Sequence, residues 1–401
     1  MELTSSIFDS HKIFSFPKVI FRFILFTLLF SSLAGCGPGP VKKIVPGASD
    51  KTSLSVEATG FTILHSDNYR KLTVIDPWQK SQDNKFEYYL IERGKKVPEA
   101  LKNKQVFFTP LQRVVCLSTT HIGFLDALGS LHTVCGLSGT IYVSNDSIKS
   151  GLSSKRIREV GNEQGLNYEA IVQLKPDVVF AYGVGSEINA QMNKLRDLGI
   201  PTVLVGEYLE QSPLGKASWI KFFGAFFEKE VLAGTIFDEI RKNYESVKSS
   251  VANVTLKPSV LTGLPFKDTW WIAGGQSNLA VLIQDAGGKF LWRENLSKEA
   301  FPVSLEEVFL RASGADFWIN CGTAASLSSL MSFDPRFSAL PAVKKLQVYN
   351  NNLRSTPAGG NDYWESGVMH PDLILSDLVR IFHPEVSGKG GFHYYRKLMK
   401  E

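Results

Sequence analysis

The sequence contains few cysteines and lacks the short motifs of familiar enzyme classes. Four of its 401 residues are cysteine, and no two of them stand in a C-x-x-C pair or at zinc-site spacing. G-x-S-x-G, H-E-x-x-H, a P-loop and a strand followed by G-x-G-x-x-G are also absent. Because an enzyme needs a reactive constellation, these absences favour a binding protein, and we expect no catalytic residue, no cofactor and no bare metal ion.

The sequence also lacks a strong excess of charge of either sign. The formal net charge is +5, the isoelectric point is near 8.8, and no block of five consecutive lysines or arginines occurs. These features argue against a nucleic-acid partner. With 44% hydrophobic and 21% charged residues, the chain is long enough for two globular domains, each with its own core.

The longest apolar run lies close to the N-terminus. Basic residues precede the apolar run FILFTLLFSSLAG (23–35). A membrane-spanning helix needs about 20 apolar residues, so this run is too short to span a membrane, but its length suits the hydrophobic core of a signal peptide. The run ends at LAGC (33–36), which resembles the bacterial lipobox. We therefore predict a signal peptide over 1–35, a lipid anchor on Cys36, and a flexible tether rich in Gly and Pro over 36–59. A membrane anchor with an incidental cysteine is the alternative.

Three further cysteines follow, namely Cys116, Cys135 and Cys321. An odd number excludes a fully paired disulfide framework, so buried and unpaired thiols are expected. A Cys116–Cys135 bridge stays open for an oxidising compartment.

The pattern of apolar residues predicts an α/β fold with two lobes. Short alternating segments over 60–110 indicate a β-rich extension. Continuous apolar strands then alternate with helical segments over 111–228 and again over 256–401. Such strands are typical of parallel sheets covered on both faces, so we expect two doubly wound lobes.

A single long helix is predicted between the lobes, within a linker over 229–255. Apolar residues recur there at steps of three and four, as Leu232, Ile236, Ile240, Tyr244, Val247 and Val251. A helix over 229–253 would be about 37 Å long and could cross both lobes. It would form a stiff hinge beside a cleft between the lobes.

Both lobes contain the same short unit, in which a capping residue and an acid begin a helix that leads into a buried strand. Asn167 and Ser304 are the predicted N-caps, and Glu169 and Glu306 follow two residues later. Glu307 can close a capping box with Ser304, which leaves Glu306 free. Helix capping and the helix dipole could explain each acid alone, but two acids at matching positions also suggest a pair on one outer face.

The order of these segments resembles the helical-backbone periplasmic binding proteins of ABC importers for iron–siderophore complexes, haem and cobalamin. The resemblance covers about 110–385 and is most specific in LNYEAIVQLKPDVVFA (166–181). It implies a monomer in the periplasm of a Gram-negative bacterium, held on the membrane by the lipid anchor. It also implies that Glu169 and Glu306 dock onto arginines of an ABC permease–ATPase complex. NEQGLN (162–167) departs from the cobalamin binders, which weakens cobalamin as the ligand.

Ligands of parallel sheets bind beyond the carboxyl ends of the strands, which selects loops crowded with aromatic residues. Flat aromatic surfaces suit a planar ligand, and a cation such as Arg354 could pair with an anionic chelate. The predicted ligand-binding residues are Thr119, His121, Tyr142, Tyr182, Tyr208, Trp271, Arg354, Tyr363 and Trp364. Each of them could instead be a core or rim residue.

Three functions are therefore compared. The favoured one is capture of a metal chelate, an iron–siderophore complex ahead of haem or cobalamin, for delivery to the permease. A lipid-anchored periplasmic hydrolase with its active site in the same cleft is the alternative, and a structural envelope lipoprotein is the third. A binding protein would release its ligand chemically unchanged, whereas a hydrolase would form product.

Overall fold

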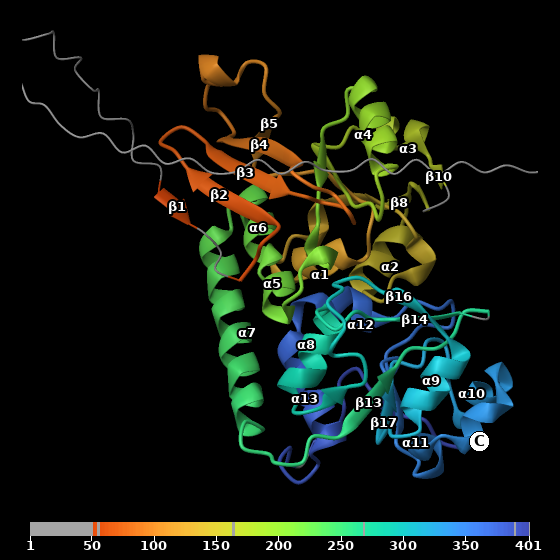
Figure 1. Cartoon of the computed structure of the whole chain (residues 1–401). Helices are drawn as coiled ribbons and strands as arrows, with labels where there is room; N and C mark the ends of the chain where they lie inside the picture. The colour runs from red at the N-terminus through yellow and green to blue at the C-terminus, as the bar shows by residue number, and fades with distance from the viewer. Residues whose placement is uncertain (1–50, 54–56, 163–164, 268, 389, 401) are drawn as a thin grey trace, which may run out of the picture. The chain divides into compact units, whose positions relative to one another are not determined.

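The computed structural model describes residues 51–53, 57–162, 165–267, 269–388 and 390–400, all within one compact unit from Ala48 to Glu401 (Figure 1). The predicted signal peptide, Cys36 and most of the tether lie outside these residues. Glu163 and Gln164 of the NEQGLN segment do so too. Within the described ranges, every helix is too short or too polar to span a membrane.

The extension forms a five-stranded sheet in the order β1-β2-β3-β4-β5, which confirms the β-rich prediction. All neighbouring strands are antiparallel except β4 and β5, which are parallel. Its inner side chains pack on the aromatic helix α6, as in the contact of Phe61 with Trp219 at 4.8 Å between ring centroids. The strands are β1 Lys51–Ser53, β2 Phe61–His65, β3 Arg70–Ile75, β4 Lys85–Glu92 and β5 Val106–Thr109.

The N-terminal lobe is built on a parallel sheet in the order β12-β11-β6-β7-β8. Every residue of β6, β7, β11 and β12 is buried, as expected for a sheet covered on both faces. The strands are β6 Val114–Cys116, β7 Val134–Leu137, β8 Arg158–Glu159, β11 Val178–Ala181 and β12 Thr202–Leu204, with a small ribbon of β9 Gly161–Asn162 and β10 Gly165–Leu166. The helices are α1 Thr120–Ala127, α2 Asp146–Ser153, α3 Tyr168–Leu174, α4 Ile188–Asp197, α5 Pro213–Ala217 and α6 Trp219–Phe226.

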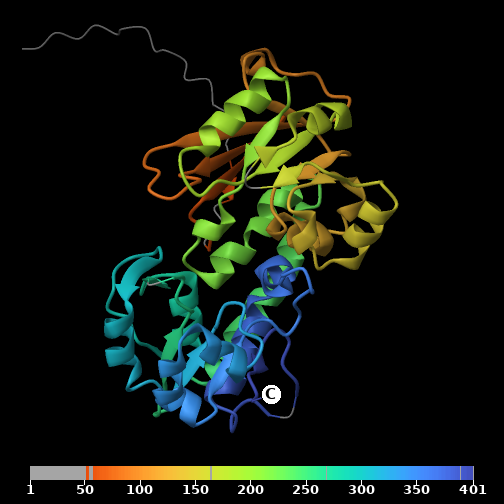
Figure 2. The ribbon, with the colours of Figure 1, turned by 90° about the vertical axis from the view of Figure 1, so that its right-hand side faces the viewer.

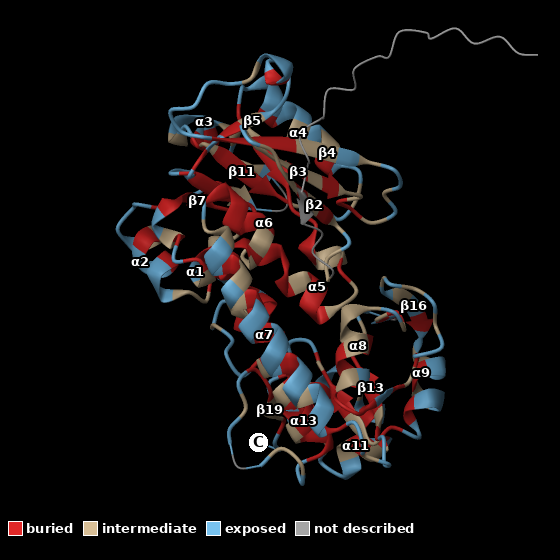
Figure 3. Cartoon of the chain, turned by 90° about the vertical axis from the view of Figure 1, so that its left-hand side faces the viewer, coloured by how far each residue is buried: buried red, intermediate tan, exposed pale blue. Residues whose placement is uncertain are grey.

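The predicted linker helix is α7, Glu230–Ser250, which at 21 residues is about 32 Å long. Ile240 and Tyr244 of the predicted stripe are buried, but Leu232 is 43% exposed, so that part of the prediction was wrong. Ala233 and Phe237 are buried in its place because the first turns of α7 pack on α6. Figure 3 shows the exposed side of α7 in pale blue.

The C-terminal lobe repeats the architecture with the sheet order β15-β13-β17-β18-β19, which is parallel except for the antiparallel edge strand β19. A separate antiparallel ribbon pairs β14 with β16. The strands are β13 Ser259–Thr262, β14 Thr269–Ile272, β15 Lys289–Phe290, β16 Phe301–Ser304, β17 Phe317–Ile319, β18 Val348–Asn350 and β19 Arg396–Lys397. The helices are α8 Asn278–Asp285, α9 Leu305–Ala312, α10 Leu327–Phe333, α11 Pro341–Lys344, α12 Asp362–Glu365 and α13 Pro371–Phe382.

Short 3-10 turns complete the described chain, at Glu99–Leu101, Leu131–Thr133, Thr140–Tyr142, Glu207–Leu209, Pro335–Ala339 and Ser366–Met369. Figure 2 shows the orange strands of the extension beside the N-terminal lobe, and the teal and blue segments of the C-terminal lobe below them. The lobes thus follow the predicted fold class.

The Cys116–Cys135 bridge is absent, since both cysteines are buried and free, as is Cys321. Cys116 lies in β6 and Cys135 in the neighbouring strand β7, but they pack into different hydrophobic clusters. Side chains alternate between the two faces of a sheet, so the two sulfur atoms lie on opposite faces. Burial raises the pKa of both thiols, which keeps them protonated.

Candidate functional site

The repeated unit predicted from the sequence is present in both lobes. The Asn167 side chain accepts a hydrogen bond from the Ala170 N–H at 2.9 Å and caps α3, while the Ser304 hydroxyl accepts one from the Glu307 N–H at 3.3 Å and caps α9. Glu169 and Glu306 both lie exposed in the first turn of their helices. The two acids therefore occupy equivalent positions.

The capping box expected at Ser304 is only half formed. The Glu307 carboxylate lies 3.3 Å from Arg311 Nε, one turn further along the helix. An ion pair with Arg311 satisfies this carboxylate, so it does not turn back toward the N-cap. Glu169 likewise accepts a side-chain hydrogen bond from Gln173 at 3.2 Å.

In the sequence, each helix of the repeated unit also leads to an aspartate directly before the strand. Asp177, which precedes β11, accepts the N–H groups of Gln112 and Arg113 at 2.7 and 3.0 Å. Asp316, which precedes β17, accepts the N–H of Ser259 at 2.9 Å. Each carboxylate thus fixes its strand to the start of the neighbouring strand, β6 or β13. The two lobes therefore share these backbone hydrogen bonds as well as the sequence pattern.

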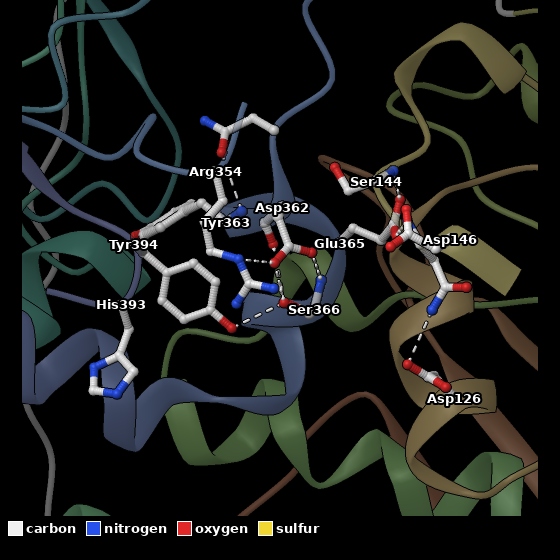
Figure 4. Close-up of polar contacts among 12 residues, drawn as sticks. Asp126, Ser144, Asp146, Arg354, Asp362, Tyr363, Glu365, Ser366, His393 and Tyr394 are labelled. Carbon is white, nitrogen blue, oxygen red and sulfur yellow. Dashed lines mark hydrogen bonds and ion pairs between the residues drawn. The ribbon is translucent and has the colours of Figure 1, made fainter. Parts of the chain in front are cut away.

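A cavity of about 530 Å³ lies between the lobes and is lined mainly by polar and charged side chains. Its walls come from α1 and α2 on one side and from residues 354–366 on the other (Figure 4). Arg354 is one of its lining residues. The guanidinium pairs with Asp362 at 3.0 Å and lies 5.7 Å from the centroid of the Tyr394 ring. An anion that binds Arg354 would have to compete with Asp362.

A second hollow, of about 230 Å³, lies at the carboxyl end of β11 and includes Tyr182 in its lining. The Tyr182 and Tyr208 rings are 6.5 Å apart and nearly perpendicular. The Tyr208 hydroxyl donates to the Gly183 carbonyl oxygen at 2.7 Å, and burial raises the pKa of this tyrosine. Two of the predicted aromatic residues therefore form a pair in the N-terminal lobe.

Tyr363 and Trp364 form the matching aromatic pair in the C-terminal lobe, with ring centroids 4.7 Å apart. They line a crevice of about 40 Å³ together with Lys216 from the N-terminal lobe. Tyr363 is buried and its pKa is raised to about 12 by burial, whereas Trp364 is 54% exposed. Trp364 is thus the more accessible of the two.

The remaining predicted ligand residues do not join these hollows. His121 is fully buried against Phe180 and Phe223, and burial lowers its pKa to about 3, so the ring is neutral. It lies in the core of the lobe and does not face the cleft, which corrects the prediction for this residue. Thr119 is half-buried at the start of α1, Tyr142 is exposed in a 3-10 turn, and Trp271 is exposed on the ribbon strand β14.

Two buried acids, Glu207 and the cavity-lining Glu365, were missed by sequence reasoning. Glu207 accepts a hydrogen bond from the Thr120 hydroxyl at 2.6 Å, and burial raises its pKa. Glu365 accepts two hydrogen bonds from the opposite lobe. Both acids belong to segments that the sequence analysis assigned to the cleft. The presence of an acid in a segment rich in aromatic residues was the sequence signal that could have identified them. Among the described residues, His, Cys, Asp and Glu side chains form no group of three placed to hold a metal ion.

The chain belongs to the periplasmic binding protein family, whose model matches residues 114–351, more than half of the sequence. This is a family of solute-binding proteins of ABC transporters, and nothing in these comparisons supports the hydrolase. The extension over 60–110 precedes the matched region.

Known relatives agree with this assignment. An uncharacterized lipoprotein of Methanocaldococcus jannaschii, MJ0878, is 27% identical over 304 residues, which cover 74% of this chain and 70% of the relative. A possible iron-binding (periplasmic solute-binding) protein of Staphylococcus epidermidis aligns with a TM-score of 0.54 at 20% identity, covering 69% of this chain and all of that one. A periplasmic haem-binding protein of Pseudomonas aeruginosa aligns at 0.53 and 16% identity, covering 69% and 94%. Because the lipoprotein relative is archaeal, a Gram-negative envelope stays a prediction.

Proposed function

We propose that the chain is a lipid-anchored extracytoplasmic protein that captures a metal chelate between its lobes and delivers it to an ABC permease. The observation that carries this proposal is the repeated unit, with Glu169 and Glu306 exposed at equivalent first-turn positions. Two matched anionic points, one in each lobe, suit a partner that must contact both lobes at once. Membership of the periplasmic binding protein family supports the same function.

An iron–siderophore complex is the ligand we favour, ahead of haem and cobalamin. The solved structures with this fold include one described as a possible iron-binding protein and one described as a haem-binding protein. In this chain, Tyr182, Tyr208 and Trp364 offer aromatic surfaces, and Arg354 offers a cation. This combination suits a planar or aromatic chelate that carries negative charge.

The experiment replaces both docking acids in one variant, Glu169→Lys with Glu306→Lys. Cells that carry only this variant should take up a labelled ferric siderophore at least about tenfold more slowly, since a loss of 1.4 kcal/mol in complex formation already gives that factor. The purified variant should bind the siderophore as tightly as the parent chain, measured by tryptophan fluorescence, because neither acid lines a hollow of the cleft.

A matched control is Glu239→Lys with Glu245→Lys, which changes the net charge equally at two exposed positions of α7. Its uptake should equal that of the parent chain. Normal uptake by the docking variant would sink the docking role. Failure of the parent chain to bind any member of a panel of ferric siderophores, haemin and cobalamin would sink the choice of ligand class.

A further inference from the structure

The extension contacts the cleft-side loops of the N-terminal lobe through the turn that joins β3 to β4. In this turn the Gln79 N–H donates to the carbonyl oxygen of Val184 at 3.0 Å. Val184 belongs to the loop after β11 and lines the hollow of about 230 Å³ that includes Tyr182. The turn precedes residue 114, where the match to the family model begins. A segment outside the matched region therefore bonds directly to a wall of this hollow.

Trp78 anchors the same turn in the core of the lobe. Its side chain is 7% exposed and belongs to one hydrophobic cluster with Ala181, Ile188 and Leu204. Ala181 is the last residue of β11, and Ile188 is both the first residue of α4 and a lining residue of the hollow. The indole ring therefore belongs to the core on which both ends of the loop after β11 rest.

The loop after β12 also approaches this turn closely. A Cβ atom built on Gly206 would lie 3.4 Å from the Cα atom of Pro77. The hydroxyl group of Tyr208, in the same loop, is a hydrogen-bonding neighbour of the Gln79 backbone. Both loops that carry the aromatic pair of the N-terminal lobe thus lie against the turn.

Internal hydrogen bonds hold the turn in shape. The Asp76 carboxylate accepts the Asn84 N–H at 2.9 Å and the Ser81 hydroxyl at 3.1 Å. The Ser81 N–H donates to the Trp78 carbonyl oxygen at 3.1 Å, and Lys80 between them has a φ of 60°. A positive φ at the third of four residues closed by such a bond is typical of a type II turn. The turn is therefore an ordered support for the loops beside it.

We propose that this turn, residues 76–84, is a positioning element of the binding site that holds the loop over 182–187 in the shape that forms the hollow. A loop that is already ordered loses less conformational entropy when a ligand binds, so the turn raises affinity without touching the ligand. The inference rests on the proposed function in one respect, namely that part of the captured chelate occupies this hollow. It gives the extension a role in ligand binding.

The first test measures the loop itself, in the full-length chain in detergent and without ligand. Trp78→Ala removes the indole ring, so the backbone amides of peptides that cover 182–190 should exchange hydrogen for deuterium at least about tenfold faster than in the parent chain. Trp78→Phe keeps an aromatic ring in the core and should restore most of the protection. Unchanged exchange in Trp78→Ala would overturn the proposal.

Ile91→Ala is the matched control for the exchange measurement. It truncates a fully buried side chain of the same extension. Among the described residues, Ile91 belongs to a separate hydrophobic cluster that contains no lining residue of the hollow. Exchange over 182–190 should therefore equal that of the parent chain. Equal acceleration in Ile91→Ala and Trp78→Ala would reflect a general loss of stability and would also overturn the proposal.

A second pair of variants isolates the hydrogen bond to Val184. Gln79 occupies the second position of the turn, where proline is common in type II turns, so Gln79→Pro keeps the turn and removes the N–H donor. Gln79→Ala removes the same side chain but keeps the donor. Loss of one hydrogen bond should speed exchange over 182–190 about two- to tenfold in Gln79→Pro alone. Equal exchange in the two variants would contradict the proposed support.

The last test measures affinity by calorimetry. The probe is the member of the panel of ferric siderophores, haemin and cobalamin that the parent chain binds most tightly. Trp78→Ala should raise the Kd at least about tenfold, Trp78→Phe should recover most of the affinity, and Ile91→Ala should stay within about twofold of the parent chain. Parent-like affinity in Trp78→Ala would overturn the proposal. If the parent chain binds no probe, the ligand class of the proposed function fails, and the exchange measurements alone decide the positioning role.

Discussion

The two lobes have the same core architecture, but different parts of the chain cover the edges of their sheets. Their sheets have the same order, since β12-β11-β6-β7 in the N-terminal lobe corresponds to β18-β17-β13-β15 in the C-terminal lobe. Both contain a capped helix with a first-turn acid, and both fix the following strand through an aspartate. Where the lobes agree, the features belong to the fold and to the proposed docking function.

The lobes differ in how they cover the corresponding sheet edge. At β12 the Leu204 N–H donates to the Tyr88 hydroxyl at 2.9 Å, and the Gln105 side chain donates to the Thr202 carbonyl oxygen at 2.8 Å. Both covering residues come from the N-terminal extension. At β18 the C-terminal segment adds the strand β19 instead. An uncovered edge strand exposes backbone groups that invite pairing with other chains, so each terminal segment protects one lobe.

The strongest test of this comparison concerns Asp377 of α13, which holds the segment leading into β19. Its fully buried carboxylate accepts the backbone N–H groups of His393, Tyr394 and Tyr395 at 2.7 to 3.0 Å. Asp377→Ala leaves three backbone donors without their partner. Since hydrogen bonds to charged groups contribute about 1.5–3 kcal/mol each, we expect the free energy of unfolding to fall by about 3 kcal/mol or more, measured by urea denaturation.

Asp372→Asn is the matched control, because this buried acid lies on the same helix and has one weak contact, with Asn243 at 3.4 Å. Its effect should stay below about 1 kcal/mol. Equal losses in the two variants would show that Asp377 does not secure the edge cover of the C-terminal lobe.

The next test concerns the edge cover of the N-terminal lobe. Tyr88→Phe removes the only atom that accepts the buried Leu204 N–H, and an unsatisfied buried donor costs about 1–3 kcal/mol. The same denaturation experiment should therefore show a loss in this range. Tyr89→Phe is the control, because the Tyr89 hydroxyl donates to the partly exposed Glu87 and its loss should cost less. If Tyr89→Phe proved the more damaging change, the extension would not cover β12 in the way described.

Local patterns predicted the framework of the lobes well. Continuous apolar strands, the long helix and both N-caps follow from the period of the sequence and from capping chemistry, which act within a few residues. The misplaced Leu232 shows the limit of this reasoning. A stripe of apolar residues identifies one face of a helix, but the packing of α6 against the first turns of α7 determines which residues there are buried.

The site was less predictable because its decisive contacts join distant residues. His121 stands in a loop assigned to the cleft, yet packing against Phe180 and Phe223 draws it into the core. In the sequence, Glu365 is one of several acids in polar loops. Only the folded chain brings its carboxylate within hydrogen-bonding distance of the Ser144 N–H, 221 positions away. Loop position alone did not tell these two outcomes apart.

The smallest expected effects test whether the two N-caps are equivalent. Asn167 and Ser304 each satisfy the N–H of the third helical residue, so Asn167→Ala and Ser304→Ala should each lower the free energy of unfolding by about 0.5–2 kcal/mol. Asn167→Gly and Ser304→Gly should cost only a few tenths of a kcal/mol, since glycine leaves the backbone open to water. A full loss in one lobe and none in the other would mean that the repeated unit is stabilised by capping in only one of its copies.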